Sequence, residues 1–285
     1  MDKTLINGQY GDSINASDRG LQYGDGLFET ILVEFGCPCY LEEHLQRLQK
    51  GCEVLGFPPL NKDILEREIF QLIETNQCGV IKLLISRGVG KRGFLPPKNP
   101  NVTRLVSFSA TKATVKNPLL SLDLVLCHTQ LSRQPLLAGL KHLNQLERVL
   151  ARSEFGDTVS TEGLMLDVEG VVIEGTMSNI FIVSKGVLMT PTLENAGVRG
   201  IIRDYLIAQA TQEGMDCREM ELSVENVIDA DEVFMTNSLM PIRAIKQLRI
   251  DDKAFIKEVG PYAHWALDSV LADIQHQVDQ HARKN

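Results

Sequence analysis

The sequence predicts a two-domain protein of mixed α/β class, with a small α/β domain over residues 1–109, a linker over 110–118 and a larger domain over 119–285. Its 285 residues lie at the upper limit of what one hydrophobic core usually organises. Residues 110–118 lose the apolar period of the segments around them. Strand-like and helix-like runs alternate without a strict βαβ rhythm, which favours a mixed sheet or partly open barrel flanked by helices over a doubly wound sheet.

The first predicted domain begins with an apolar, β-prone strand at residues 27–33. Apolar side chains then recur at helical spacing over residues 41–55 and predict a helix that ends before Gly56. The remaining elements are a helix at 62–76 and strands at 80–86 and 105–109. Residues 88–100, which are rich in Gly, Lys, Arg and Pro, predict a long loop between those two strands.

The second predicted domain resumes with a strand at residues 122–127. Further strands are expected at 163–166, 171–173, 180–183, 187–189 and 233–236, and helices at 144–154 and 201–213. A last helix is expected to begin at Pro261, where a missing N–H costs nothing, and to run to about residue 275. The polar tail at 277–285 is expected to fray.

The composition argues against several classes of partner. A net charge of -8 provides no general basic field, so we expect neither nucleic acid nor an anionic membrane as a partner. No window approaches the roughly 18 uninterrupted apolar residues of a spanning helix. The first residues lack the apolar stretch of a secretory signal, and we therefore expect a cytoplasmic protein.

The cysteines and histidines give no sign of a metal site. The six cysteines are scattered without a Cys-x-x-Cys pair, which predicts free thiols. The six histidines show no metal-ligand spacing, and neither a Gly-x-Ser-x-Gly elbow nor a phosphate-binding Walker loop occurs. We expect no metal, no serine hydrolase and no P-loop nucleotide site.

Lys141 and Glu174 are the first candidates for chemistry. Lys141 follows an apolar run at residues 136–140, so its amine can be partly withdrawn from water, which would favour the neutral, nucleophilic form. The alternative is a lysine that extends its ammonium to solvent. Glu174 ends a β-branched run, where a buried carboxylate needs a cationic partner such as a protonated pyridine nitrogen. Its alternative is a solvated glutamate in a hairpin turn.

Three further segments can bind an anion. The glycine loop at residues 197–200 opens an apolar helix whose first N–H groups attract phosphate. Arg47 lies beside the apolar stripe of the first helix and can grip phosphate oxygens, although a solvated arginine is the commoner case. The hydroxyl and amide groups of residues 236–238 can hold an anion or shape a turn.

Taken in order, these segments resemble the fold-type IV family of pyridoxal-phosphate enzymes, which includes branched-chain and D-amino acid aminotransferases and 4-amino-4-deoxychorismate lyase. The resemblance covers nearly the whole chain. Its segments are DRGLQYGDGLFET at residues 18–30, HLQRL at 44–48, GLK at 139–141, EGTMSNIF at 174–181, GVRGIIR at 197–203 and MTNS at 235–238.

The resemblance implies a small α/β domain, a larger pseudo-barrel domain with a mixed sheet, and a homodimer that acts on a small molecule between the domains. It implies that pyridoxal 5'-phosphate is held as a Schiff base on Lys141, with Glu174 on the pyridine nitrogen. The residues implied for the cofactor phosphate and its surroundings are Arg47, Ile201, Ile202, Asn237 and Ser238.

Within the family, KHLNQLE at residues 141–147 and TNSLMP at 236–241 look like the lyase, as does SRGVGKRG at 86–93. Thr30 and Asn144 are candidates for substrate binding, and Arg87 or Arg92 for a substrate carboxylate; the alternative for both arginines is a solvated basic loop. The expected reaction releases 4-aminobenzoate and pyruvate. Two alternatives remain: an aminotransferase on the same scaffold, and a non-catalytic protein that binds the cofactor or a protein partner.

Overall fold

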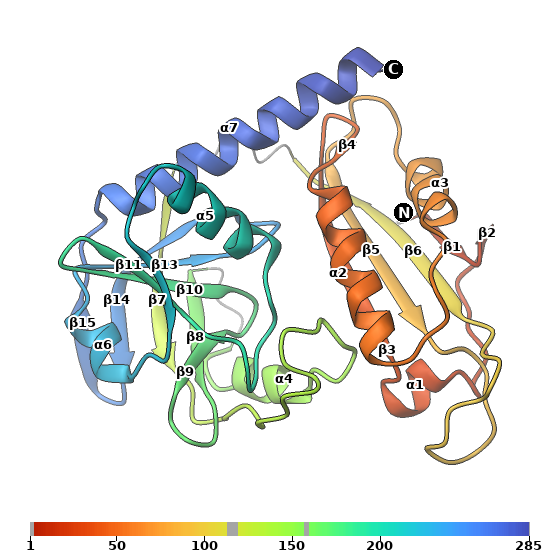
Figure 1. Cartoon of the computed structure of the whole chain (residues 1–285), viewed down its shortest axis with the longest axis horizontal. Helices are drawn as coiled ribbons and strands as arrows, with labels where there is room; N and C mark the ends of the chain where they lie inside the picture. The colour runs from red at the N-terminus through yellow and green to blue at the C-terminus, as the bar shows by residue number, and fades with distance from the viewer. Residues whose placement is uncertain (1–2, 113–118, 157–159, 285) are drawn as a thin grey trace. The chain divides into compact units, whose positions relative to one another are not determined.

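The chain forms two units in the computed structural model, which describes residues 3–112, 119–156 and 160–284 (Figure 1). Unit 1 comprises Met1–Lys116, Leu140–Asn144 and Ile274–Asn285. Unit 2 comprises Asn117–Gly139 and Gln145–Asp273. This division departs from the expected domains at Leu140–Asn144 and at the C-terminus, both of which join unit 1. The expected linker at 110–118 falls largely on residues 113–118, outside the described residues.

Unit 1 is built on a six-stranded antiparallel sheet in the order β2-β1-β6-β5-β3-β4. Its elements are β1 (Lys3–Ile6), β2 (Gln9–Tyr10), α1 (Arg19–Tyr23), β3 (Gly26–Glu34), β4 (Cys37–Pro38), α2 (Leu41–Val54), α3 (Lys62–Leu72), β5 (Gly79–Ser86) and β6 (Thr103–Ala110). Helix α2 packs so closely on β3 that a Cβ at Gly51 would lie 2.8 Å from Leu27 Cδ1. Phe28 and Thr30 are half-buried, and because side chains alternate along a strand they lie on the other face of β3.

Unit 2 is built on a nine-stranded mixed sheet in the order β12-β11-β10-β13-β14-β7-β8-β9, with β15 also paired to β14. Its strands are β7 (Leu120–Leu126), β8 (Thr161–Leu166), β9 (Val172–Gly175), β10 (Asn179–Ser184), β11 (Val187–Pro191), β12 (Cys217–Met220), β13 (Glu232–Thr236), β14 (Arg243–Ile250) and β15 (Lys253–Ile256). Its helices are α4 (Leu146–Ser153), α5 (Ile201–Gln212), α6 (Val224–Asp229) and the first part of α7 (Pro261–Lys284).

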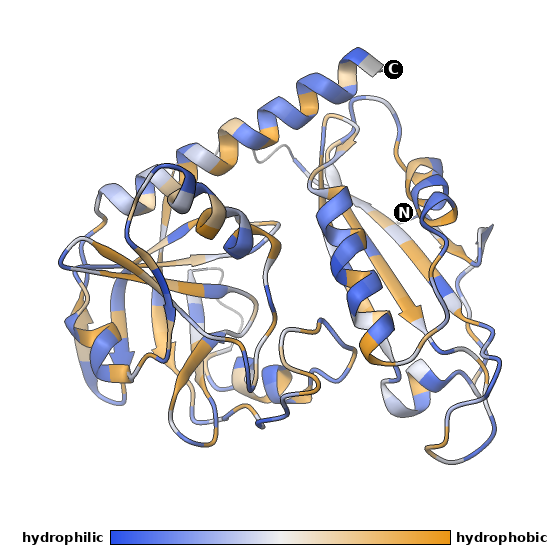
Figure 2. Cartoon of the chain, viewed as in Figure 1, coloured by the Kyte–Doolittle hydropathy of each residue, from blue (hydrophilic) through white to orange (hydrophobic). Residues whose placement is uncertain are grey.

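The nine-stranded sheet curls around a hydrophobic core (Figure 1). Strands far apart in its order contribute to this core, among them β7 with Leu124, β9 with Val172 and β10 with Ile182. Figure 2 shows hydrophobic residues concentrated in the strands, whereas α2 and α7 alternate hydrophilic and hydrophobic residues. The nine-stranded mixed sheet of unit 2 confirms the predicted mixed sheet. No helix in the described residues is long and apolar enough to cross a membrane.

The C-terminal tail is helical, so the prediction that residues 277–285 fray is wrong for the described part, which extends α7 to Lys284. Two contacts within unit 1 hold it. Gln277 Oε1 accepts a hydrogen bond from Tyr40 N at 2.7 Å. The rings of His281 and Phe70 stack with centroids 5.8 Å apart. These partners are distant in sequence, which a local polar pattern does not reveal.

Candidate active site

The segment that carries Lys141 is fixed to the first residues of β3. Phe28 N donates to Lys141 O at 2.9 Å, and Leu143 N donates to Gly26 O at 3.0 Å. Lys141 is half-buried, and its Nζ lies 4.4 Å from the centroid of the Phe28 ring. Lys82 Nζ lies 5.5 Å from the same ring. An aromatic face attracts both ammonium groups and so gathers two cations in one place.

Asn144 completes the attachment of this segment. Its Nδ2 donates to Gly24 O at 3.0 Å, and its backbone N donates to His142 Nδ1 at 3.2 Å. Gly24 caps α1 at a φ of 65°, and a Cβ there would lie 2.4 Å from Asn144 Oδ1. The structure therefore shows Asn144, a predicted substrate residue, holding the Lys141 segment to unit 1.

Arg47 takes part in a buried network with Glu29 and His44. Arg47 Nε donates to Glu29 Oε1 at 2.8 Å, and His44 Nδ1 lies 2.6 Å from Glu29 Oε2. Burial alone would raise the pKa of Glu29, but the charges and hydrogen bonds of Arg47 and His44 prevail and lower it to about 2. Burial lowers the pKa of His44, although Glu29 opposes this. Glu29 is thus ionised near pH 7. Arg47 is fixed by its partners and is not the solvated arginine of the alternative interpretation.

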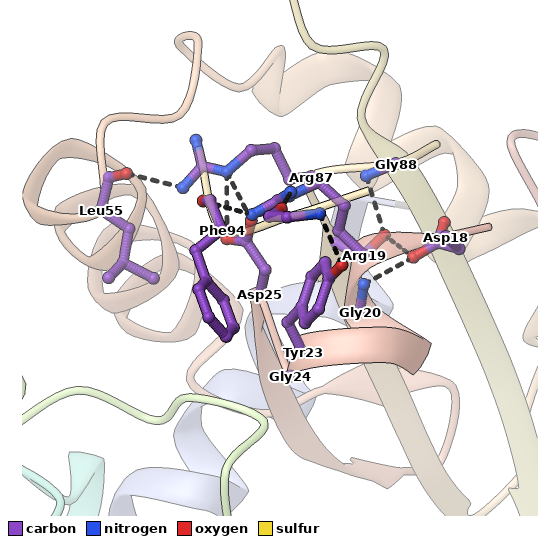
Figure 3. A network of polar contacts seen from close by, with 12 residues as sticks. Asp18, Arg19, Gly20, Tyr23, Gly24, Asp25, Leu55, Arg87, Gly88 and Phe94 are labelled. Carbon is purple, nitrogen blue, oxygen red and sulfur yellow. Dashed lines mark hydrogen bonds and ion pairs between the residues drawn. The ribbon is translucent and has the colours of Figure 1, made fainter. Parts of the chain in front are cut away.

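Arg87 and Arg92 differ sharply in environment. Arg87 is buried; its Nε donates to Asp25 Oδ2 at 2.8 Å and its Nη2 to Leu55 O at 2.8 Å (Figure 3). The guanidinium also lies 4.1 Å from the centroid of the Phe57 ring. These internal partners give Arg87 a structural role, neither that of a solvated residue nor that expected for a substrate ligand. Arg92 is exposed.

Arg19, which the sequence analysis did not single out, holds the loop that carries Arg92. Its Nε donates to Asp25 Oδ2 at 2.7 Å, and its Nη1 and Nη2 each donate at 2.9 Å to the carbonyl oxygens of Gly93 and Phe94 (Figure 3). Burial would raise the pKa of Asp25, but its bonds to Arg87 and Arg19 prevail and lower it. An ionised Asp25 between two arginines therefore holds Arg19, which joins the loop to α1.

Glu174 is buried in β9 of unit 2, which excludes the solvated hairpin glutamate. Its Oε2 accepts Val198 N at 2.9 Å and Asn179 Nδ2 at 3.3 Å. Its Oε1 forms an ion pair with Arg148 Nη2. Asn179 also approaches the glycine loop, since a Cβ at Gly200 would lie 1.9 Å from Asn179 Oδ1. Asn179 thus joins the candidate pyridine ligand to the candidate phosphate loop.

The other predicted phosphate residues adjoin Asn179. Ile201 and Ile202 begin α5, whose Gly200 cap has no side-chain bond, and the first N–H groups of a helix lack intrahelical acceptors. Thr236 pairs with Asn179 in the sheet, and its buried Oγ1 has no hydrogen-bond partner among the described residues. The next two residues are also predicted to lie near the phosphate. Ser238 is half-buried, and Asn237 Oδ1 accepts a hydrogen bond from Leu239 N at 2.9 Å, which shapes the turn.

A family model for class IV aminotransferases matches residues 26–248. The chain belongs to the class IV aminotransferase family. An aminodeoxychorismate lyase of Vibrio harveyi is 34% identical over 90% of this chain and 94% of its own length. A putative branched-chain-amino-acid aminotransferase of Methanocaldococcus jannaschii is 34% identical over 88% of this chain and 90% of its own. A crystal structure of 4-amino-4-deoxychorismate lyase from Pseudomonas aeruginosa matches with a TM-score of 0.87 and 38% identity, over 95% of this chain and 99% of that one.

These matches confirm the resemblance and the predicted class IV fold. Two further groups were not predicted from the sequence. Lys82 lies among apolar neighbours in the predicted strand at 80–86, and its side chain is exposed. Glu162 is a buried carboxylate that accepts Thr176 N at 3.1 Å and Ser178 Oγ at 3.0 Å, and so holds the turn after Glu174. The described residues contain no cluster able to hold a metal ion.

Proposed function

We propose that this class IV protein is a lyase that uses pyridoxal 5'-phosphate to convert 4-amino-4-deoxychorismate into 4-aminobenzoate and pyruvate. One observation carries the proposal: the chain combines a half-buried lysine on a fixed segment with a buried glutamate joined to a glycine loop. The similarity to lyases over nearly the whole chain supports this reaction.

The residues present fit the cofactor. Glu174 is a buried carboxylate able to accept from a ring nitrogen, and Gly200 brings the start of α5 against Asn179, which binds that carboxylate. The unsatisfied Thr236 Oγ1 and the N-terminus of α5 supply donors for a phosphate. We also assign Arg47, which Glu29 fixes, to the cofactor phosphate, because the resemblance implies this role and a guanidinium suits an anion.

In the proposed mechanism Lys141 would hold the cofactor until the substrate amine takes its place, which frees the Lys141 amine. When bound, the cofactor would withdraw electrons and so make the C–H beside the substrate amine more acidic. Lys141 Nζ removes this proton as a general base. The electron pair expels the enolpyruvyl group, which takes up a proton and becomes pyruvate, while the substrate ring becomes aromatic. The Phe28 ring attracts the ammonium form of Lys141 and so holds its Nζ in place when it carries the proton.

Substrate carboxylates need cations, and Lys82 and Arg92 are exposed cations of unit 1. Lys82 pairs with Thr30 across β3 and β5, so both side chains lie on the Phe28 face of the sheet. We assign a substrate carboxylate to Lys82, with the Thr30 hydroxyl as a second donor, and retain Arg92 as the exposed arginine of its loop.

The assembly we propose is a homodimer in the cytoplasm. Leu146, Val149 and Leu150 follow helical spacing on α4 and are 75%, 60% and 57% exposed. Such an apolar stripe suits burial against a second copy. All six cysteines are free, which suits a reducing compartment.

The main rival is an aminotransferase, which the relative from Methanocaldococcus jannaschii supports. The deciding experiment supplies 4-amino-4-deoxychorismate, generated in place, without any 2-oxo acid. The lyase predicts equal amounts of 4-aminobenzoate and pyruvate, and Lys141→Ala should form neither. Amino transfer to an added 2-oxo acid without these products would establish the rival. A non-catalytic binder would show a visible absorbance band that borohydride removes, but no product from either reaction.

A further inference from the structure

Arg148 makes an ion pair that the proposed mechanism does not use. It lies on α4 and contacts Glu174 Oε1 through Nη2. The two side chains are 14% and 4% exposed, so this pair is largely withdrawn from water. Interactions between charges are stronger in such a place than at a solvated surface.

The geometry of Glu174 restricts where another cation can bind it. Oε2 already accepts two hydrogen bonds, from Val198 N and Asn179 Nδ2. Oε1 accepts Arg148. A carboxylate oxygen has two acceptor positions, so a ring N–H that bonds to Oε1 shares that oxygen with the guanidinium. Two cations on one carboxylate oxygen repel each other at short range.

We propose that Arg148 is a positioning residue that acts through Glu174 and weakens the hold of the cofactor's ring nitrogen on its proton. This inference rests on the proposed function. A like charge nearby disfavours the charged form, and a single neighbouring charge can shift a pKa by about 1–3 units. The wild-type ring nitrogen should therefore lose its proton at a lower pH than in a chain without the Arg148 charge.

The same effect bears on the choice of reaction. A ring that holds its proton less firmly withdraws less charge, so the electron pair left by proton removal stays more on the substrate. There it breaks the bond to the enolpyruvyl oxygen and makes the ring aromatic. Amino transfer instead needs that pair to be protonated at a cofactor carbon. Arg148 thus favours elimination over amino transfer.

The test uses the complete chain loaded with pyridoxal phosphate labelled with ¹⁵N in its ring. The ¹⁵N chemical shift is followed against pH in wild type, Arg148→Gln and Arg148→Lys. Arg152→Gln is the matched control, because Arg152 lies on the same helix and bonds to Thr161 O at 3.0 Å. We expect the midpoint to rise by about one pKa unit in Arg148→Gln. Arg148→Lys and Arg152→Gln should keep the wild-type midpoint.

An unchanged midpoint in Arg148→Gln overturns the inference, as does a lysine variant that behaves like the glutamine variant. A merely structural Arg148 would lower the melting temperature without moving the midpoint. Circular dichroism checks folding, and Arg148→Met, which also removes the charge, replaces the glutamine variant if that one does not fold. Wild type is assayed in parallel for 4-aminobenzoate and for cofactor trapped on Lys141 by borohydride. If wild type yields neither 4-aminobenzoate nor trapped cofactor, the proposed function is rejected. If wild type is active and the midpoint of Arg148→Gln equals that of wild type, only the role of Arg148 is rejected.

Discussion

Replacing Glu29 by glutamine tests the buried network beneath the Lys141 segment. Glu29 is 1% exposed and accepts from Arg47 and His44. Its pKa is lowered from 4.5 to about 2, which corresponds to about 3 kcal/mol of stability at neutral pH, since each pKa unit is worth about 1.4 kcal/mol. Glutamine keeps the shape and loses the charge. We therefore expect Glu29→Gln to lower the free energy of unfolding by about 3 kcal/mol at pH 7.

The pH dependence follows from the direction of the shift. A carboxyl whose pKa is lowered in the folded state stabilises the fold fully above the unfolded value and loses this effect as pH falls through the folded value. The window for Glu29 runs from about pH 4.5 down to about 2. The difference between wild type and Glu29→Gln should shrink from about 3 kcal/mol at pH 7 to about 1 kcal/mol at pH 3.

Urea denaturation of the cofactor-free chain, followed by circular dichroism at pH 7, 5, 4 and 3, measures this difference. Glu43→Gln is the matched control because Glu43 lies exposed on α2, the helix that carries His44 and Arg47, and it should change stability by at most about 0.5 kcal/mol. A loss below about 1 kcal/mol in Glu29→Gln at pH 7, or one that does not shrink toward pH 3, would refute the reasoning.

Three further substitutions test the proposed site. Lys82→Met removes a cation beside Phe28 and should raise KM at least about tenfold in steady-state kinetics, with cofactor binding unchanged by absorbance. An unchanged KM would contradict the assignment of Lys82 to a substrate carboxylate. Gly200→Ala sets a Cβ 1.9 Å from Asn179 Oδ1 and should weaken cofactor affinity more than tenfold in an absorbance titration, and undiminished affinity would count against the phosphate loop. Asn144→Ala frees the lysine segment from α1 and should lower kcat with little change in KM; equal kcat would leave Asn144 without a positioning role.

The sequence predicted elements whose apolar residues repeat with a clear period. The helix at 41–55 and the strand at 27–33 are confirmed as α2 and β3. Strand β14 was missed because Arg243, Lys246 and Arg249 interrupt its apolar residues, although it lies between β13 and β7. These charged residues belong to a strand because β14 pairs with a strand on either side, and that pairing cannot be inferred from the local sequence.

The sequence predicted those site residues that lie in segments resembling the family, but it did not predict the residues that form ion pairs with them. Arg47 and Glu174 were named in advance, whereas Glu29 and Arg148 were not recognised as their partners, nor His44 as the second partner of Glu29. A charged residue on a helix usually faces solvent, so pattern alone favours the solvated interpretation. Burial by a distant strand reverses that interpretation, and this depends on tertiary contacts.

The structure gives a physical reason for the glycines between α1 and β3. Gly24 adopts a φ of 65° and receives the Asn144 amide, while Gly26 accepts a hydrogen bond from Leu143 N. A Cβ at Gly26 would lie 2.2 Å from Ile85 O, so no other residue fits between β5 and the Lys141 segment. The position of Lys141 therefore depends on residues more than 100 positions earlier in the chain, and a substitution at Gly26 should disturb the lysine as directly as one beside it.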